Sequence, residues 1–403
     1  MKIVGKILGF MALAIAISGC MPRELWSYGG VVPGNPSWNG NGVSSGDVTQ
    51  DGRVLYVTGV EYPSGYAWKD SFGSDVECKI FLMKNGVRVE EITIRPQEGM
   101  TADPDMHRCS GGRLCLDYVS GEETVVVCGD EELFRIPGRE YIYGFRTIGD
   151  TVHTVSCPRE GGGWTYRENG ESVCRSSKGS PMPGMFEDCG RAYFRVIEKQ
   201  PVGEVYMGTC FYYVGGEQMP LGQVDGQVVY DFMLAGGDQC VLSAASSNSS
   251  VKLRVGDSSF LIPCTRGMKI SDARLAIGEG NVGAIVRFIG DMGYETAIWE
   301  DGAVRRLRGV KVKAAAMSGK GLWCVSDSLG AQVPQLSVLC RDEEVAVLPE
   351  GYDIIYDSCL AACGENCCIA LTDALENNRP ALWLNGKLTD YDFNGFFTSV
   401  TWQ

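Results

Sequence analysis

The stretch Pro380-Ala381-Leu382-Trp383-Leu384-Asn385-Gly386-Lys387-Leu388 predicts the fold of this chain. It consists of an apolar strand, an Asn-Gly turn and a returning strand. Both central residues of a type I′ turn need positive φ, which glycine accepts freely and asparagine tolerates, so Asn-Gly is typical of a two-residue β-hairpin. One hairpin would specify little, but related segments recur along the whole chain.

Eight segments share this pattern of a strand followed by a short polar turn. The turns at Asn85 and Asn385 lie 300 residues apart in seven steps, so the period is about 43 residues, a length typical of a four-stranded propeller blade. The strands are 80–84, 124–128, 164–168, 210–214, 251–255, 296–300, 336–341 and 381–384, and the turns after them begin at Asn85, Gly129, Asn169, Gly215, Gly256, Asp301, Asp342 and Asn385.

A second strand precedes each hairpin, and several of these strands are apolar on both faces. Inner strands of a propeller blade are covered on both sides by neighbouring blades, which explains runs such as 284–286. We assign these second strands to 53–59, 113–119, 151–157, 205–208, 239–244, 283–288, 321–326 and 367–372.

The sequence therefore predicts an all-β β-propeller of eight four-stranded blades that occupies residues 43–403 as a single domain. Residues 396–402 form a last strand, which we expect to pair with the first unit and close the ring, because closure removes the open sheet edge. Seven blades is the main alternative, since the unit at 109–136 is short and irregular.

The net charge of the chain argues against one class of binding partner. The chain has 403 residues and a formal net charge of −14, and without Lys2 and Lys6 the charge becomes −16. A net negative charge of this size repels phosphate backbones and therefore argues against nucleic-acid partners.

The N-terminal residues resemble a bacterial lipoprotein signal. Residues 1–19 contain Lys2, Lys6 and an apolar run too short to span a bilayer comfortably, and Ile17-Ser18-Gly19-Cys20 is similar to the lipobox. The resemblance implies acylation of Cys20, for example with palmitate, and, because Met21 follows rather than aspartate, anchoring in the outer membrane. An ordinary cleaved signal is the alternative. Residues 20–42 are rich in Pro and Gly and are interpreted as a flexible tether.

Sixteen cysteines follow Cys20, an even number that favours disulfide bonds in an exported protein. Cys115 with Cys128, and Cys324 with Cys340, lie on neighbouring predicted strands, but spacing alone does not determine connectivity. The dense group at 359–368 lacks paired CxxC arms and a nearby histidine, so cross-links are favoured there over zinc or iron-sulfur ligation.

The tandem pattern of a Tyr-Val-Thr-Gly-like strand followed by Trp-x-Asn-Gly resembles the repeats of a largely uncharacterised group of exported bacterial propeller lipoproteins. The resemblance covers nearly all of the mature chain and implies the propeller fold. It implies no particular activity.

Catalytic motifs are weak in this sequence. GxSxG at 42–46 follows a Pro/Gly-rich tether, and GxGxxG at 278–283 precedes a strand, so neither has the context that its chemistry requires. The two histidines, His107 and His153, are interpreted as ordinary loop and strand residues, with acid-base chemistry as the alternative. No catalytic residue can be assigned, and a glycosidase-like carboxylate pair cannot be located.

One stretch has the start of a calcium loop. Asp390, Asp392 and Asn394 supply alternating oxygen ligands, but Thr401 stands where the bidentate glutamate belongs. We interpret the stretch as a blade connection, with a Ca²⁺ site as the alternative; otherwise no cofactor is predicted.

Exposed aromatic residues are the candidate ligand-binding groups. Tyr62, Tyr66 and Trp68 lie in the longest aromatic insertion, and Trp164 and Tyr166 follow three glycines. Flat rings on exposed loops can stack on sugar faces or anchor a protein partner, whereas the alternative is that these rings fold back over the blade edge.

These observations favour a membrane-anchored lipoprotein of the cell envelope that acts as a non-catalytic recognition propeller for a glycan or protein ligand. One alternative is a propeller enzyme, a glycoside hydrolase or lyase, with its site at the axial mouth where loops of all blades converge. A structural envelope scaffold is the other.

Overall fold

The computed structural model describes residues 52–67, 76–101, 103, 107–202, 205–221, 227–245, 250–291, 293–328, 335–341, 343–375 and 378–403. The predicted signal, Cys20, the tether and Trp68 lie outside these residues. In the described part of the chain no helix is long and apolar enough to cross a membrane.

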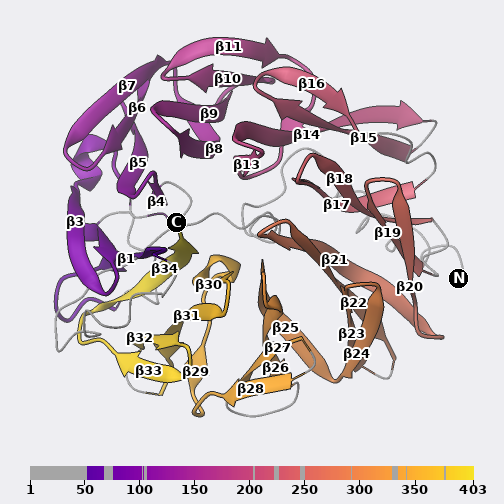
Figure 1. The fold of residues 1–403 in the computed structure, drawn as a ribbon. Coiled ribbons are helices and arrows are strands. Elements are labelled where there is room, and N and C mark those ends of the chain that lie inside the picture. The colour runs from indigo at the N-terminus through magenta and orange to yellow at the C-terminus, as the bar shows by residue number, and fades with distance from the viewer. Residues whose placement is uncertain are drawn as a thin grey trace, which may run out of the picture.

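The described strands form eight antiparallel sheets arranged in a ring, and each sheet is one blade of a propeller (Figure 1). Blade 1 contains β34 (Gly395–Trp402), β1 (Leu55–Glu61), β2 (Cys78–Lys84) and β3 (Val87–Ile94). Blade 2 contains β4 (His107–Ser110), β5 (Arg113–Ser120), β6 (Glu123–Cys128) and β7 (Glu131–Pro137). Blade 3 contains β8 (Glu140–Ile148), β9 (Thr151–Pro158), β10 (Trp164–Glu168) and β11 (Glu171–Ser176). Blade 4 contains β12 (Ser180–Pro181), β13 (Phe186–Asp188), β14 (Arg191–Val202), β15 (Val205–Val214) and β16 (Glu217–Pro220).

The second half of the ring has the same plan. Blade 5 contains β17 (Gln227–Ala235), β18 (Asp238–Ala245), β19 (Ser250–Val255) and β20 (Ser258–Pro263). Blade 6 contains β21 (Met268–Gly278), β22 (Asn281–Gly290), β23 (Gly293–Glu300) and β24 (Ala303–Arg308). Blade 7 contains β25 (Val310–Ser318), β26 (Gly321–Ser328), β27 (Leu336–Cys340) and β28 (Glu343–Val347). Blade 8 contains β29 (Tyr352–Asp353), β30 (Leu360–Cys363), β31 (Asn366–Asp373), β32 (Arg379–Leu384) and β33 (Lys387–Asp390). Among the described residues, the 3₁₀ helix η2 (Pro96–Glu98) lies in the connection between blades 1 and 2, and the 3₁₀ helix η3 (Asp357–Cys359) lies between β29 and β30 of blade 8.

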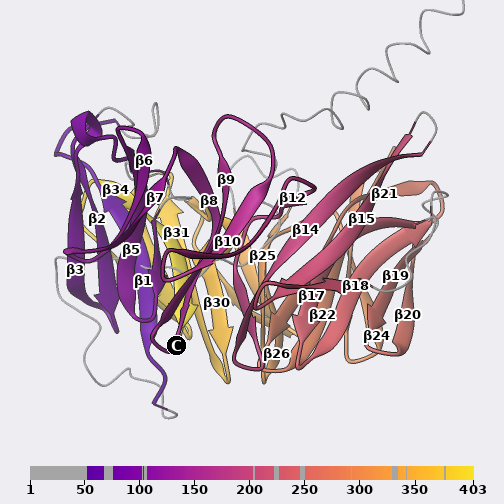
Figure 2. The same ribbon diagram turned by 90° about the horizontal axis from the view of Figure 1, so that it is seen from above.

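The ring is closed by the C-terminal strand, as the sequence predicts. β34 is the innermost strand of blade 1 and pairs antiparallel with β1 from Leu55↔Trp402 to Glu61↔Gly395 (Figure 1). Figure 2 shows the blades from the side and the C-terminus on the lower face. Gly395 is needed there because a Cβ on it would lie 1.9 Å from the Val60 carbonyl oxygen. Eight blades are confirmed, and the seven-blade alternative is wrong.

The outer turns explain why the Asn-Gly signal identifies the blades. Asn85, Asn169 and Asn385 all have φ near +48°, and the glycine after each also has positive φ. Each asparagine Oδ1 also accepts a hydrogen bond of 2.8–2.9 Å from a backbone N–H at the start of the second strand of its own blade. One side chain therefore fixes both the turn and the distance between two strands.

The sequence predicts one strand and one turn at the wrong positions. Residues 205–208 begin β15, the third strand of blade 4, and the second strand of that blade is β14. The sequence signal is weak there because β14 contains Lys199, Gln200 and Pro201. In blade 7 the positive-φ turn residue is Arg341, and Glu343 already begins β28.

Apolar side chains are buried mainly between adjacent blades, so the core consists of a series of clusters around the ring. Such a core explains why most inner strands lack clean alternation, since both faces of each sheet are covered.

Candidate functional site

The aromatic insertion of blade 1 folds back onto the protein. Tyr62 is only 4% exposed, and its ring centroid lies 5.1 Å from that of Tyr66 and 6.4 Å from that of Phe396. Tyr66 is half-buried against the same cluster, while Trp68 lies outside the described residues. The Tyr62 ring therefore packs between blades 1 and 2 and does not present a face to solvent.

Trp164 and Tyr166 are also buried, at 2% and 1% exposure. The Trp164 centroid lies 4.7 Å from that of Tyr213 in blade 4, and the Tyr166 hydroxyl is 2.7 Å from both His153 Nδ1 and Glu168 Oε1. The two rings join blade 3 to blade 4. In this structure they belong to the core, because they are the first and third residues of β10 and not part of the glycine loop before it.

The residues of the calcium-loop pattern are engaged with neighbouring loops. Asp390 Oδ1 accepts a hydrogen bond of 2.6 Å from the Tyr352 hydroxyl, and Asn394 Nδ2 donates to the carbonyl oxygens of Pro63 at 2.6 Å and Tyr66 at 3.0 Å. Asp392 is exposed. Asn394 thus holds the aromatic insertion in place. Among the described residues, no group of three or more His, Cys, Asp or Glu side chains is arranged to hold a metal ion.

One predicted cysteine pair is bonded. Cys115 and Cys128 lie directly opposite each other on β5 and β6 and form a disulfide. Cys324 and Cys340 also lie on neighbouring strands but are offset by one residue, since Trp323 pairs with Cys340. An offset of one residue places their side chains on opposite faces of the sheet, so these two thiols cannot meet.

Charged side chains near the axis connect blades 6, 7 and 8. Arg274 on β21 forms an ion pair with Asp357 in η3 and donates to the Val312 and Lys313 carbonyl oxygens on β25 at 3.3 Å. Lys313 Nζ in turn lies 2.5 Å from Asp353 Oδ1. Burial raises the pKa of the Asp357 carboxyl above its ordinary value, although Arg274 acts in the opposite direction.

A β-bulge recurs in innermost strands, next to these charges. The extra residue lies five positions before the last residue of the strand in blades 3, 5 and 7, four positions before it in blade 1 and seven positions before it in blade 6. Bulges re-aim side chains and are common beside functional sites. The bulged residues are Thr398, Tyr143, Tyr230, Lys313 and Ser271.

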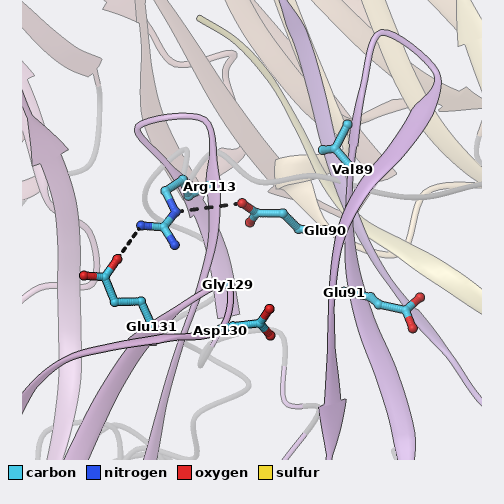
Figure 3. Close-up of a pocket in the computed structure, with 7 residues that line it drawn as sticks. All are labelled: Val89, Glu90, Glu91, Arg113, Gly129, Asp130 and Glu131. Carbon is cyan, nitrogen blue, oxygen red and sulfur yellow. Dashed lines mark hydrogen bonds and ion pairs between the residues drawn. The ribbon is translucent and has the colours of Figure 1, made fainter.

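A hollow of about 510 Å³ lies on the outer side of the ring between blades 1 and 2. Figure 3 shows Arg113 on β5 between the carboxylates of Glu90 on β3 and Glu131 on β7. The hollow is lined by Val89, Glu90, Glu91, Arg113, Gly129, Asp130 and Glu131.

The hollow exists because blade 1 has a carboxylate where blade 2 has an aromatic ring. In blade 1, Leu82 lies three residues before the outer turn and pairs with Glu90 on β3. In blade 2 the equivalent residue, Val126, pairs with Phe134 on β7. Phe134 fills the junction with blade 3, where a Cβ on Gly170 would lie 2.9 Å from its ring. Glu90 instead leaves the corresponding junction polar.

The carboxylates of the hollow have different roles. Glu90 Oε2 accepts the Leu114 N–H at 2.6 Å, which links blades 1 and 2, and Glu91 pairs with Lys79 at 2.7 Å. Asp130 forms no hydrogen bond or ion pair with a described residue. With four carboxylates and one guanidinium, the hollow favours positively charged groups.

No protein-family model matches the chain, and no curated protein matches it. Solved structures are similar in fold. The β-propeller domain of the Trilobed protease from Pyrococcus furiosus has a TM-score of 0.44 at 11% identity, over 71% of this chain and 89% of that chain. The polysaccharide lyase Uly1 has a TM-score of 0.44 at 9% identity, over 73% and 91%. A puromycin-hydrolyzing peptidase from Mycobacterium tuberculosis has a TM-score of 0.41 at 11% identity, over 89% and 56%. These likenesses concern the propeller fold.

Sequence reasoning missed the axial charges, the bulges and the hollow. No motif marks them, because they arise from residues far apart in sequence, such as Arg274 and Asp357. A signal for the hollow was nevertheless present, since aligning the eight repeats on their turns places Glu90 at the position of Phe134.

Proposed function

We propose that the protein is a lipoprotein anchored in the bacterial outer membrane through Cys20, whose propeller recognises a glycan or protein ligand without catalysing a reaction. The anchor rests on the lipobox-like residues 17–20. Attached acyl chains would hold the propeller at the membrane surface, because each buried methylene contributes about 0.8 kcal/mol.

The observation that carries a non-catalytic role is the pairing of the buried charges. Arg195 and Asp231 (2.6 Å) link blades 4 and 5, Arg108 pairs with Asp117 inside blade 2, and Arg274 pairs with Asp357. A general acid or base needs a side chain that is presented to substrate, whereas these groups are occupied with other parts of the protein. The hollow between blades 1 and 2 is the candidate contact surface, and its charge favours a ligand with exposed lysine or arginine over a neutral glycan.

The anchor is tested by expressing the full chain and a Cys20→Ser variant with an alkyne fatty acid. The proposal expects label and outer-membrane fractionation for the native chain and neither for the variant. Equal labelling of both proteins would refute acylation at Cys20.

Recognition at the hollow is tested with Asp130→Asn/Glu131→Gln. Removing two carboxylates should weaken binding of a fluorescent oligolysine peptide about tenfold at low salt and less at high salt, since rim charges contribute about 1 kcal/mol. The matched control is Glu217→Gln/Asp257→Asn, which also removes two exposed carboxylates, one at the start of β16 in blade 4 and one in the β19–β20 turn of blade 5. Equal weakening of peptide binding by both pairs of substitutions would show that only net charge matters. Recognition of a glycan is tested separately by applying the native chain to a glycan array.

A second candidate, a glycoside hydrolase or lyase acting at the axial mouth, is favoured by one observation. Asp357 has a raised pKa, as a general acid requires, and lies just before β30, the innermost strand of blade 8. Product release from a polysaccharide panel, abolished by Asp357→Asn, would establish this function in place of recognition.

A further inference from the structure

His107 lies at the point where the ring closes. It begins β4, the innermost strand of blade 2, and is 4% exposed. Its Nδ1 is 3.1 Å from the Asp103 carbonyl oxygen, and its Nε2 is 3.3 Å from Thr398 Oγ1 on the closing strand β34. The imidazole therefore connects blade 2 to the C-terminal strand.

Thr398 is the bulged residue of β34 and contacts three blades. Its hydroxyl bonds with that of Thr58 on β1, and its carbonyl oxygen accepts the Ser358 hydroxyl of blade 8 at 2.8 Å. We call Thr58, His107, Ser358 and Thr398 the closure junction. Because these four residues join blades 1, 2 and 8 through β34, the junction fixes the strand that completes the ring.

Burial, and not the direction of the hydrogen bonds, favours the neutral imidazole of His107. A carbonyl oxygen can only accept, so Nδ1 carries a proton and donates to Asp103 in both charge states. In the neutral form Nε2 accepts from the Thr398 hydroxyl, whereas in the imidazolium Nε2 would donate to it. A second proton on Nε2 would reverse the hydroxyl chain from Thr398 to Thr58. It would also place a positive charge in a site closed to water.

The charged groups around His107 do not offset that burial. β34 and β1 present the hydroxyls of Thr398 and Thr58, β5 places Leu116 opposite His107, and the neighbouring Arg108 is paired with Asp117. Burial is the main reason that the pKa of His107 falls to about 4; Arg108 lowers it further, and Asp103 acts weakly in the opposite direction.

We propose that His107 is a proton-sensitive switch of ring closure: the neutral imidazole holds β34 in blade 1, and its protonation releases β34 from β1 and opens the propeller there. An unfolded or released histidine has a pKa of about 6.5. Because the closed form binds the proton more weakly, closure is at full strength above about pH 6.5 and weakens as pH falls toward 4.

Hydrogen exchange of the native full chain tests this switch. After correction for intrinsic rates, protection of the β34 amides should fall about 60-fold between about pH 7 and pH 4.5, as the two pKa values dictate. Protection of β22 in blade 6 should change much less. Equal losses in both strands would mean global acid unfolding and would overturn the proposal.

Two variants make the test specific. His107→Gln, which keeps an acceptor and a donor but does not titrate, should remove the pH dependence at β34 whatever its effect on stability at neutral pH. His153→Gln changes the other histidine, in blade 3, and should leave the pH dependence of β34 intact. A β34 pH dependence that persists in His107→Gln would contradict the switch, as would constant β34 protection in the native chain.

Discussion

The asparagines of the outer turns show how one residue can specify a blade. Asn169 adopts φ +47° in the β10–β11 turn, and its Oδ1 accepts the Val152 N–H at 2.8 Å. Most side chains are strained in a left-handed backbone, so few residues can replace Asn169 without cost. Without the Oδ1 acceptor, the Val152 N–H near the start of β9 would bond only to water.

Asn169→Ala should therefore lower the free energy of unfolding by about 2 kcal/mol. Asn169→Gly keeps the backbone freedom but loses the hydrogen-bond acceptor, so it should cost about 1 kcal/mol. Asn169→Asp keeps both features and should cost close to nothing. Urea titrations of the three variants measure the order. An alanine variant as stable as the native chain would show that the turn does not depend on this residue.

The binding residues expected from the sequence illustrate what residue type alone cannot tell. Tyr62, Trp164 and Tyr166 are aromatic and follow loop-like sequence, which is equally compatible with an exposed platform and with a buried blade junction. The structure places all three rings in the core. Residue type and local sequence set their chemistry, whereas burial depends on the neighbouring blade, which is distant in sequence.

At the scale of elements, buried charges hold adjacent blades in register. Asp231 on β17 accepts hydrogen bonds from Arg195 of blade 4 at 2.6 Å and from the Leu275 N–H of blade 6 at 2.9 Å. Arg195 is fully buried. One carboxylate therefore joins three blades.

Asp231→Ala should destabilise the protein by about 3–5 kcal/mol, because it removes the carboxylate that balances the charge of the buried Arg195 guanidinium. Thermal unfolding of the variant measures this loss. The control Asp257→Ala removes an exposed carboxylate from a turn of the next hairpin in the same blade and should change stability by less than about 0.5 kcal/mol. Similar melting temperatures for both variants would contradict the three-blade link.

The strand plan of the blades could be predicted because each blade repeats the same local signals. Seven of the eight second strands are found where the sequence places them, and so are the outer turns except that of blade 7, which begins one residue earlier. The second strand of blade 4 is missed because β14 contains Lys199, Gln200 and Pro201. The bulges of the innermost strands could not be predicted, because a bulge depends on register against the partner strand and not on composition.

At the scale of the whole molecule, closure of the ring is the feature on which the rest depends. β34 joins blade 1 to blades 2 and 8 through Thr398, so the first and last strands of the described chain stabilise one another. The sequence predicts this pairing because an exposed inner edge would be left open without it. The proton sensitivity assigned to His107 acts on this same feature.

Closure is tested most directly by cross-linking Val57 to Val400, which lie opposite each other on β1 and β34 and are both buried. Val57→Cys/Val400→Cys, oxidised and digested, should yield the two peptides as one disulfide-linked species, just as Cys115 and Cys128 are joined across β5 and β6. Val57→Cys/Thr401→Cys, whose side chains face opposite sides of the sheet, should not. Recovery of separate peptides from the first variant, or equal linkage in both, would contradict a propeller closed by its C-terminal strand.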